Sequence, residues 1–135
     1  MIERIFWPFY FGAGGPIASG KQYFPWIHVN DVAGLYHHAI QTDMNGVYNA
    51  VSPQTVTNGE FSSAFAQALW RPAFIPLPGF VPKVMFGPER AKIMTEGQKV
   101  IPKRTVESGY EYIYPDIKDA CKACAVALYK IDGID

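Results

Sequence analysis

The chain has 135 residues, of which 49% are hydrophobic and 18% are charged, a balance typical of a globular domain and not of a disordered chain. Its formal net charge is zero, so nothing favours a nucleic acid or an anionic membrane as a partner. Two cysteines and no signal-peptide pattern argue against a secreted, disulfide-stabilised protein. We therefore expect one compact intracellular unit, cytoplasmic or organellar and not secreted.

The first segment, residues 2–11, predicts a helix. Pro8 lies inside its pattern, so we expect a kink or a short helix, and the glycine-rich turn from Gly12 ends it. No capping residue precedes the apolar pattern, so we expect a helix that is cut short at its start. The residues at helical spacing are Ile2, Ile5, Phe6, Phe9 and Tyr10.

The stretch from Gly20 to Asp31 predicts a turn, a short buried strand over 26–29 and the start of a helix. Trp26, Ile27 and Val29 favour a strand, and their run is too short for a helix. Asn30 and Asp31 are expected to cap the helix that follows. That helix shows one apolar stripe at Val32, Leu35, Tyr36, Ala39 and Ile40.

Residues 46–52 predict a second short strand, and a second helix follows it. Thr57 and Glu60 have the spacing of a capping box, and the apolar residues over 61–69 recur with helical spacing. An alternation of strand and helix predicts α/β architecture with parallel strand pairing.

The later segments predict further short elements. Residues 74–75 are a possible strand, and 81–86 and 89–96 are expected to form two short helices. Tyrosines alternate with other residues over 109–115, which predicts a strand with one aromatic face. A last helix is expected over 116–129.

A match to the phosphate-binding loop spacing occurs over Gly15–Lys21. The position after Lys21 should be Ser or Thr, and here it is Gln22. Pro16 also removes a backbone N–H that a phosphate would need. The loop precedes a predicted strand, whereas a phosphate loop follows one, so we interpret it as a plain loop.

Tyr114 and Lys118 have the Tyr-x3-Lys spacing of short-chain dehydrogenases, in which the lysine lowers the pKa of the tyrosine. Pro115 forces Tyr114 out of helical geometry, so the two side chains need not share a face. We interpret the match as chance.

Cys121 and Cys124 form a C-x-x-C pattern that lies in the middle of the last predicted helix, on its apolar stripe, so buried core residues are the better interpretation. His28, alone on a predicted strand, is expected to be a hydrogen-bonded structural residue. His37 and His38 are expected on a helix surface, with one ring turned inward. The residues alone therefore predict no catalytic, cofactor-binding or metal site.

A family resemblance adds to this reading. Gly20, Gln22, Ile27, His28, Val29 and Asp31 resemble the signature G-x-Q-x-R-D-F-I-H-V-x-D of the extended short-chain dehydrogenase/epimerase superfamily. Five ordered motifs over about residues 4–128 are similar to the atypical epimerase-family oxidoreductases of the 39U type, which carry an uncharacterised C-terminal extension. These motifs are Gly12-x-Gly-Gly-Pro-Ile, Pro25-Trp-Ile-His, Asn58-x-Glu-Phe, Gly97-Gln-Lys-Val-Ile-Pro and Gly109-Tyr-x-Tyr-x-Tyr-Pro.

The resemblance implies the C-terminal, substrate-side lobe of an NAD(P)-binding Rossmann-like fold, with the N-terminal dinucleotide-binding half absent. We expect residues 1–52 to end the Rossmann-like part, 53–130 to form the C-terminal extension, and 131–135 to be a tail. The full-length family would use NADP, and none is expected to bind this chain alone. No catalytic or cofactor-binding residue can be transferred to it.

The family's phosphate-binding arginine aligns with Phe24 and the following aspartate with Pro25, which argues against a UDP-sugar substrate. The resemblance implies part of an NADP-dependent oxidoreductase that acts on an unknown carbonyl or alcohol compound and is inactive alone. The alternative is a non-catalytic interaction module that pairs with a full-length homologue or forms a homo-oligomer. An apolar wall for the small-molecule substrate is expected from Phe6, Phe9, Tyr10, Phe24 and Trp26.

Overall fold

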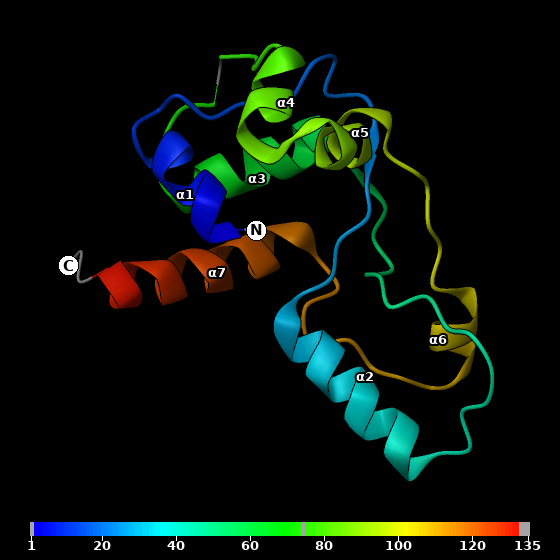
Figure 1. The fold of residues 1–135 in the computed structure, drawn as a ribbon. Coiled ribbons are helices and arrows are strands. Elements are labelled where there is room, and N and C mark those ends of the chain that lie inside the picture. Colours follow the sequence, from blue (N-terminus) through cyan, green and yellow to red (C-terminus); the bar gives the residue numbers. More distant parts are fainter. Residues whose placement is uncertain (1, 74, 133–135) are drawn as a thin grey trace.

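The computed structural model describes residues 2–73 and 75–132. Helices α1, α3 and α7 pack together around a hydrophobic core, and α4 packs on α5 beside them (Figure 1). Helix α2 projects away from this group and lies near α6 and the long loops (Figure 1). The helices are α1 (Ile2–Tyr10), α2 (Val29–Gln41), α3 (Asn58–Ala68), α4 (Phe80–Phe86), α5 (Pro88–Glu96), α6 (Lys103–Glu107) and α7 (Ile117–Asp132).

The predicted helices are confirmed, and α6 is the helix that the sequence did not predict. Helix α3 begins as expected: Thr57 Oγ1 accepts from the Glu60 N–H at 3.3 Å, and Glu60 Oε2 accepts from the Thr57 N–H at 2.7 Å. This reciprocal pair satisfies two backbone donors that a helix start would otherwise leave free. Helix α6 has only five residues, too few for a periodic apolar pattern.

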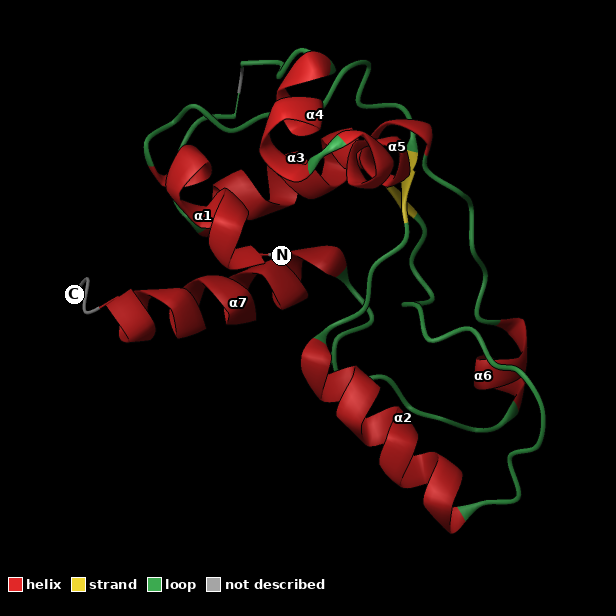
Figure 2. Cartoon of the chain, in the orientation of Figure 1, coloured by secondary structure: helices red, strands yellow, loops and turns green. Residues whose placement is uncertain are grey.

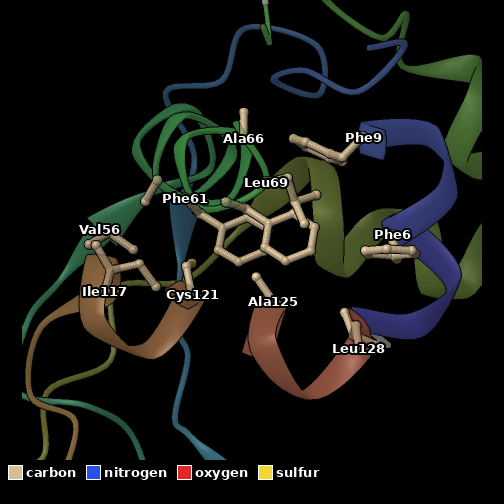
Figure 3. Close-up of a cluster of buried hydrophobic side chains, with 12 residues drawn as sticks. Phe6, Phe9, Val56, Phe61, Ala66, Leu69, Ile117, Cys121, Ala125 and Leu128 are labelled. Carbon is tan, nitrogen blue, oxygen red and sulfur yellow. The ribbon is translucent and has the colours of Figure 1, made fainter. Parts of the chain in front are cut away.

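The core lies where α1, α3 and α7 meet (Figure 3). Phe6 and Phe9 of α1 point into it and are 1% and 5% exposed. The ring of Phe9 lies 5.2 Å from that of Phe65, and the ring of Phe6 lies 5.9 Å from that of Tyr129. These edge-to-face contacts stabilise the packing beyond the burial of area.

The sheet is smaller than predicted, and its strands pair in the opposite sense. Strands β1 (Tyr23–Phe24) and β2 (Val56–Thr57) form an antiparallel pair (Figure 2). The strands expected over 26–29, 46–52 and 109–115, and their parallel pairing, are therefore wrong. The possible strand at 74–75 includes residue 74, which lies outside the described residues, and Ile75 is not in a strand.

Residues 45–51 show why a predicted strand is absent. Alternate carbonyls of an extended chain point to opposite edges, and those of one edge here accept hydrogen bonds from side chains instead of from a neighbouring strand. Within the part of the chain that the structure describes, the backbone of Tyr48 and Ala50 on the other edge, and of Gly46 at the bend before them (φ +92°), makes no hydrogen bond. We call this the open edge. The bonded carbonyls are those of Asn45 and Val47 with Arg104, Asn49 with Thr105, and Val51 with Tyr112, at 2.8–2.9 Å.

Helix α2 also leaves an apolar face without cover. Leu35 is buried, but Val29, Tyr36 and Ile40 are 70%, 71% and 85% exposed. With Ala33, which is exposed as well, they follow helical spacing and form one face. We call these four residues the exposed stripe of α2. The apolar stripe expected over 32–40 is therefore buried only at Leu35.

Asp31 fastens α2 to the rest of the chain and does not cap it, contrary to expectation. Its carboxylate is fully buried and accepts from the N–H of Ile113 at 2.6 Å, the N–H of Tyr114 at 3.0 Å and the hydroxyl of Tyr110 at 3.1 Å. A Cβ at Gly34 would lie 2.5 Å from the Tyr110 hydroxyl, so glycine permits this approach. In the segment predicted as a strand over 109–115, the Asp31 carboxylate therefore accepts backbone hydrogen bonds that a neighbouring strand would otherwise accept.

We expect the Asp31→Asn substitution to lower the free energy of unfolding by about 2–3 kcal/mol, because the amide group cannot accept every hydrogen bond that the carboxylate accepts. Urea denaturation measures this change. The control is Asp119→Asn on α7, where the side chain is 66% exposed and the change should stay below about 0.5 kcal/mol. Equal losses in the two variants would contradict the role given to Asp31.

Candidate functional site: an apolar cavity beside α7

A cavity of about 480 Å³ lies between α7, the segment over 24–29 and the start of α1. Its size falls within the range of small-molecule sites, about 300–1,000 Å³. Most of its surface is apolar. Its main lining residues are Phe24, Trp26, His28, Phe61, Phe65, Ile117, Ala120, Cys121, Cys124 and Leu128.

The structure brings together two of the five residues expected to form an apolar wall. Phe24 and Trp26 line the cavity. Phe6 and Phe9 lie in the core instead (Figure 3), and Tyr10 packs on the Phe6 ring at 5.6 Å. The spacing of α1 showed that these three side chains share a face, but it could not show which neighbour that face meets.

Phe24 and Trp26 are held in place from both sides of the segment. Phe24 belongs to β1, and its ring stacks on Phe61 of α3 with 4.4 Å between centroids. The Trp26 indole N–H donates to the carbonyl of Gln54 at 3.1 Å. Both rings therefore present fixed apolar surfaces to the cavity.

His28 supplies a polar group to the cavity wall. It is the N-cap of α2, and its Nδ1 accepts from the Asn30 N–H at 3.2 Å. Its ring packs against Tyr114 with 4.1 Å between centroids. Burial lowers the pKa of His28 and outweighs the opposing effect of the Asp31 carboxylate, so the ring is neutral at pH 7 and carries its proton on Nε2. The expectation of a hydrogen-bonded histidine is confirmed, although His28 lies at a helix cap and not on a strand.

Cys121 and Cys124 form part of the opposite wall. Cys121 is buried in the core, as predicted from its helical spacing, and Cys124 is half-buried. Burial raises the pKa of Cys121 to about 12 and also raises that of Cys124. Both thiols are therefore protonated at neutral pH and suited to packing more than to nucleophilic chemistry.

Sequence reasoning missed the wall that α7 gives the cavity, although α7 contains a signal for it. Ala120, Cys124 and Ala127 follow helical spacing and line the cavity. Small residues in a row on an otherwise apolar face leave a hollow where larger ones would fill the space. The two cysteines were assigned to the core because the pattern gives the face of a residue and not the depth of its neighbours.

The Gly15–Lys21 loop does not fit the phosphates of a dinucleotide. The N–H of Ile17 donates to Asn58 Oδ1 at 2.7 Å, and the N–H of Ala18 donates to the carbonyl of Leu77 at 2.9 Å. A phosphate loop must offer such amides to its ligand. These amides are used inside the chain, which supports the interpretation of a plain loop.

Tyr114 contacts His28, and Lys118 lies exposed in the first turn of α7.

Among residues 2–73 and 75–132, no three His, Cys, Asp or Glu side chains are grouped so that they could hold a metal ion. In those same ranges, none of the helices has the length and apolar character that crossing a bilayer requires.

Comparison with known proteins gives consistent matches. A family model described as a domain of unknown function (DUF1731) matches residues 77–124. The bovine epimerase family protein SDR39U1 is 50% identical over 123 residues, which are 90% of this chain and 42% of that protein. A chloroplastic SDR39U1 homologue from Arabidopsis thaliana is 42% identical over 112 residues, 82% of this chain and 32% of that protein.

A solved structure agrees with these matches. The crystal structure of human epimerase family protein SDR39U1 (isoform2) with NADPH superposes with a TM-score of 0.88 at 48% identity, and it covers 93% of this chain and 43% of the human chain. The chain therefore has the fold of the corresponding part of human epimerase family protein SDR39U1, as the resemblance implied. The chain is a homologue of epimerase family protein SDR39U1 that spans less than half of its length.

We expect His28 to titrate below pH 6.5, because burial disfavours the charged ring. Since the folded-state pKa is lowered, the stabilisation from the neutral ring is present above pH 6.5 and is lost as the pH falls through the folded-state pKa. An NMR titration of the His28 ring measures the midpoint, and urea denaturation at several pH values measures the stability. A midpoint at or above 6.5 would contradict the burial argument.

We expect iodoacetamide to alkylate the folded chain at pH 8 far more slowly than the urea-unfolded chain. The pKa of about 12 at Cys121 lowers its thiolate fraction by about a thousandfold. Mass spectrometry of timed samples measures the modification, and a Cys124→Ser variant assigns the signal of Cys121. Equal rates in the folded and unfolded chains would show that the thiols are not protected.

Proposed function

We propose that this chain is the substrate-side lobe of an NADP-dependent epimerase-family oxidoreductase, inactive alone and completed by a dinucleotide-binding half. The observation that carries this proposal is the match to human SDR39U1 with NADPH, which covers 43% of the human chain. The completed protein transfers a hydride between NADP and a carbonyl or alcohol carbon of a small molecule. Its location is intracellular, in the cytoplasm or an organelle.

Two surfaces of the chain support the proposal that a second half packs against it. The exposed stripe of α2 is apolar, with Ile40 85% exposed, and such a face is stabilised when another element covers it. The open edge over 46–50 offers backbone donors and acceptors to a neighbouring strand. We infer that a parallel sheet in the dinucleotide-binding half pairs with the open edge and packs on the stripe.

The residues of this chain indicate which of the two halves binds the dinucleotide and which contacts the substrate. The Gly15–Lys21 loop uses its Ile17 and Ala18 amides internally, so the other half holds the dinucleotide phosphates. This lobe contributes the apolar wall with Phe24 and Trp26. No guanidinium group lines the cavity among its described residues, which supports a substrate without a nucleotide-sugar phosphate.

A second candidate function uses the same exposed surfaces. The chain can act as a non-catalytic module that pairs with a full-length homologue or with a second copy of itself. Sedimentation equilibrium of the chain alone separates the possibilities. A concentration-dependent dimer that Ile40→Glu disrupts would favour this module over the proposed function.

We expect this chain to associate with the remaining part of human SDR39U1, produced as a separate polypeptide, and the complex to bind NADPH. The Ile40→Glu substitution should weaken the association at least about tenfold, because it places a charge on an apolar face that becomes buried. Size-exclusion chromatography measures the complex, and NADPH fluorescence measures cofactor binding.

The matched control is Val126→Glu on α7, which replaces an apolar residue that is 55% exposed but lies outside the stripe. It should leave association unchanged. Saturable NADPH binding by this chain alone, or unchanged association of the Ile40→Glu variant, would contradict the proposed function.

A further inference from the structure

We propose that the cavity beside α7 binds an uncharged, largely apolar molecule whose carbonyl oxygen accepts a hydrogen bond from Nε2 of His28. The cavity of about 480 Å³ is built by this chain's own residues. The inference rests on the proposed function, which assigns the Phe24 and Trp26 wall of this cavity to the substrate, and it names the chemical class of the ligand.

The polarity of the ligand follows from the hydrogen bonds of His28. Nδ1 accepts from the Asn30 N–H, so the neutral ring presents Nε2 as a donor. In the described chain, no residue hydrogen-bonds Nε2, and no buried side-chain nitrogen or oxygen lacks a partner. Nε2 is therefore not sealed off inside the protein, and His28 borders the cavity. A donor in this place selects an acceptor on the ligand.

The apolar body of the ligand follows from the surrounding walls. Phe24 and Trp26 present aromatic surface on one side, and Ala120, Cys124 and Leu128 of α7 line the other. Such walls favour a flat or extended hydrocarbon group. Protonated thiols, which follow from the raised pKa values of the two cysteines, keep that wall uncharged.

The absence of charge on the ligand follows from the lining groups. Glu3 is the one formally charged residue among the described residues that line the cavity. A carboxylate or phosphate on the ligand would therefore lose water without gaining a cation. An uncharged carbonyl meets the His28 donor at the lowest cost in desolvation.

Three aryl probes of one shape test the proposal on the full chain. They are 2-acetylnaphthalene, which carries the carbonyl, 2-ethylnaphthalene, which lacks it, and 2-naphthoate, which is charged. Titration of the ¹⁵N-labelled chain, followed by NMR, gives the three affinities and the shift of His28 Nε2. We expect 2-acetylnaphthalene to bind about three- to tenfold more tightly than 2-ethylnaphthalene and to shift the Nε2 signal, and 2-naphthoate to bind more weakly than either.

Two variants locate the effect. His28→Asn keeps a favourable helix cap, but its shorter side chain cannot place a donor where Nε2 lies. The affinity for 2-acetylnaphthalene should therefore fall to that for 2-ethylnaphthalene, and the affinity for 2-ethylnaphthalene should stay unchanged. Cys124→Phe fills the cavity and should abolish the binding of both. A merely structural role for His28 would weaken both probes together.

The proposal is overturned if no probe binds, if the ketone and the hydrocarbon bind equally to the unmodified chain, or if His28→Asn leaves their ratio unchanged. Binding that persists in Cys124→Phe overturns the location. Because none of these measurements uses NADPH or the second half, their failure leaves the proposed function standing, and its failure leaves them intact.

Discussion

The buried carboxylate of Asp31 is the contact on which the layout of this lobe depends. It joins the first turn of α2 to Ile113 and Tyr114, more than 80 residues later in the chain. Tyr114 in turn packs on His28, and α7 begins three residues after it. One set of charge-assisted hydrogen bonds therefore aligns α2, the polar residue of the cavity and the helix that forms its wall.

The helices were predictable because their signals are local. The capping box of Thr57 and Glu60 is readable from four consecutive positions and is present in the structure. The strands were not predictable, because a strand requires a neighbour that its own residues do not specify. The Arg104 guanidinium donates to the carbonyls of Asn45 and Val47, one just before and one within the predicted strand over 46–52. These contacts join residues almost 60 positions apart, which no local pattern encodes.

The site was predictable only in part, for a related reason. Phe24 and Trp26 line the cavity, but Phe6 and Phe9 fill the core, and periodicity cannot tell a core face from a cavity face. The family resemblance gave the fold and the relatives, which the comparisons confirm. Only the structure shows that Nδ1 of His28 caps α2 and that Nε2 is left as a hydrogen-bond donor, because both roles depend on which ring nitrogen meets the Asn30 N–H.

The exposed stripe of α2 leaves apolar side chains in contact with solvent, and the open edge leaves backbone groups without hydrogen bonds. The most direct measurement of this account is amide hydrogen exchange at Gly46, Tyr48 and Ala50, whose backbone groups make no hydrogen bond within the described chain. We predict rapid exchange in the chain alone and strong protection when the remaining part of human SDR39U1 is added. Protection already present in the chain alone, or exchange unchanged by the added half, would contradict it.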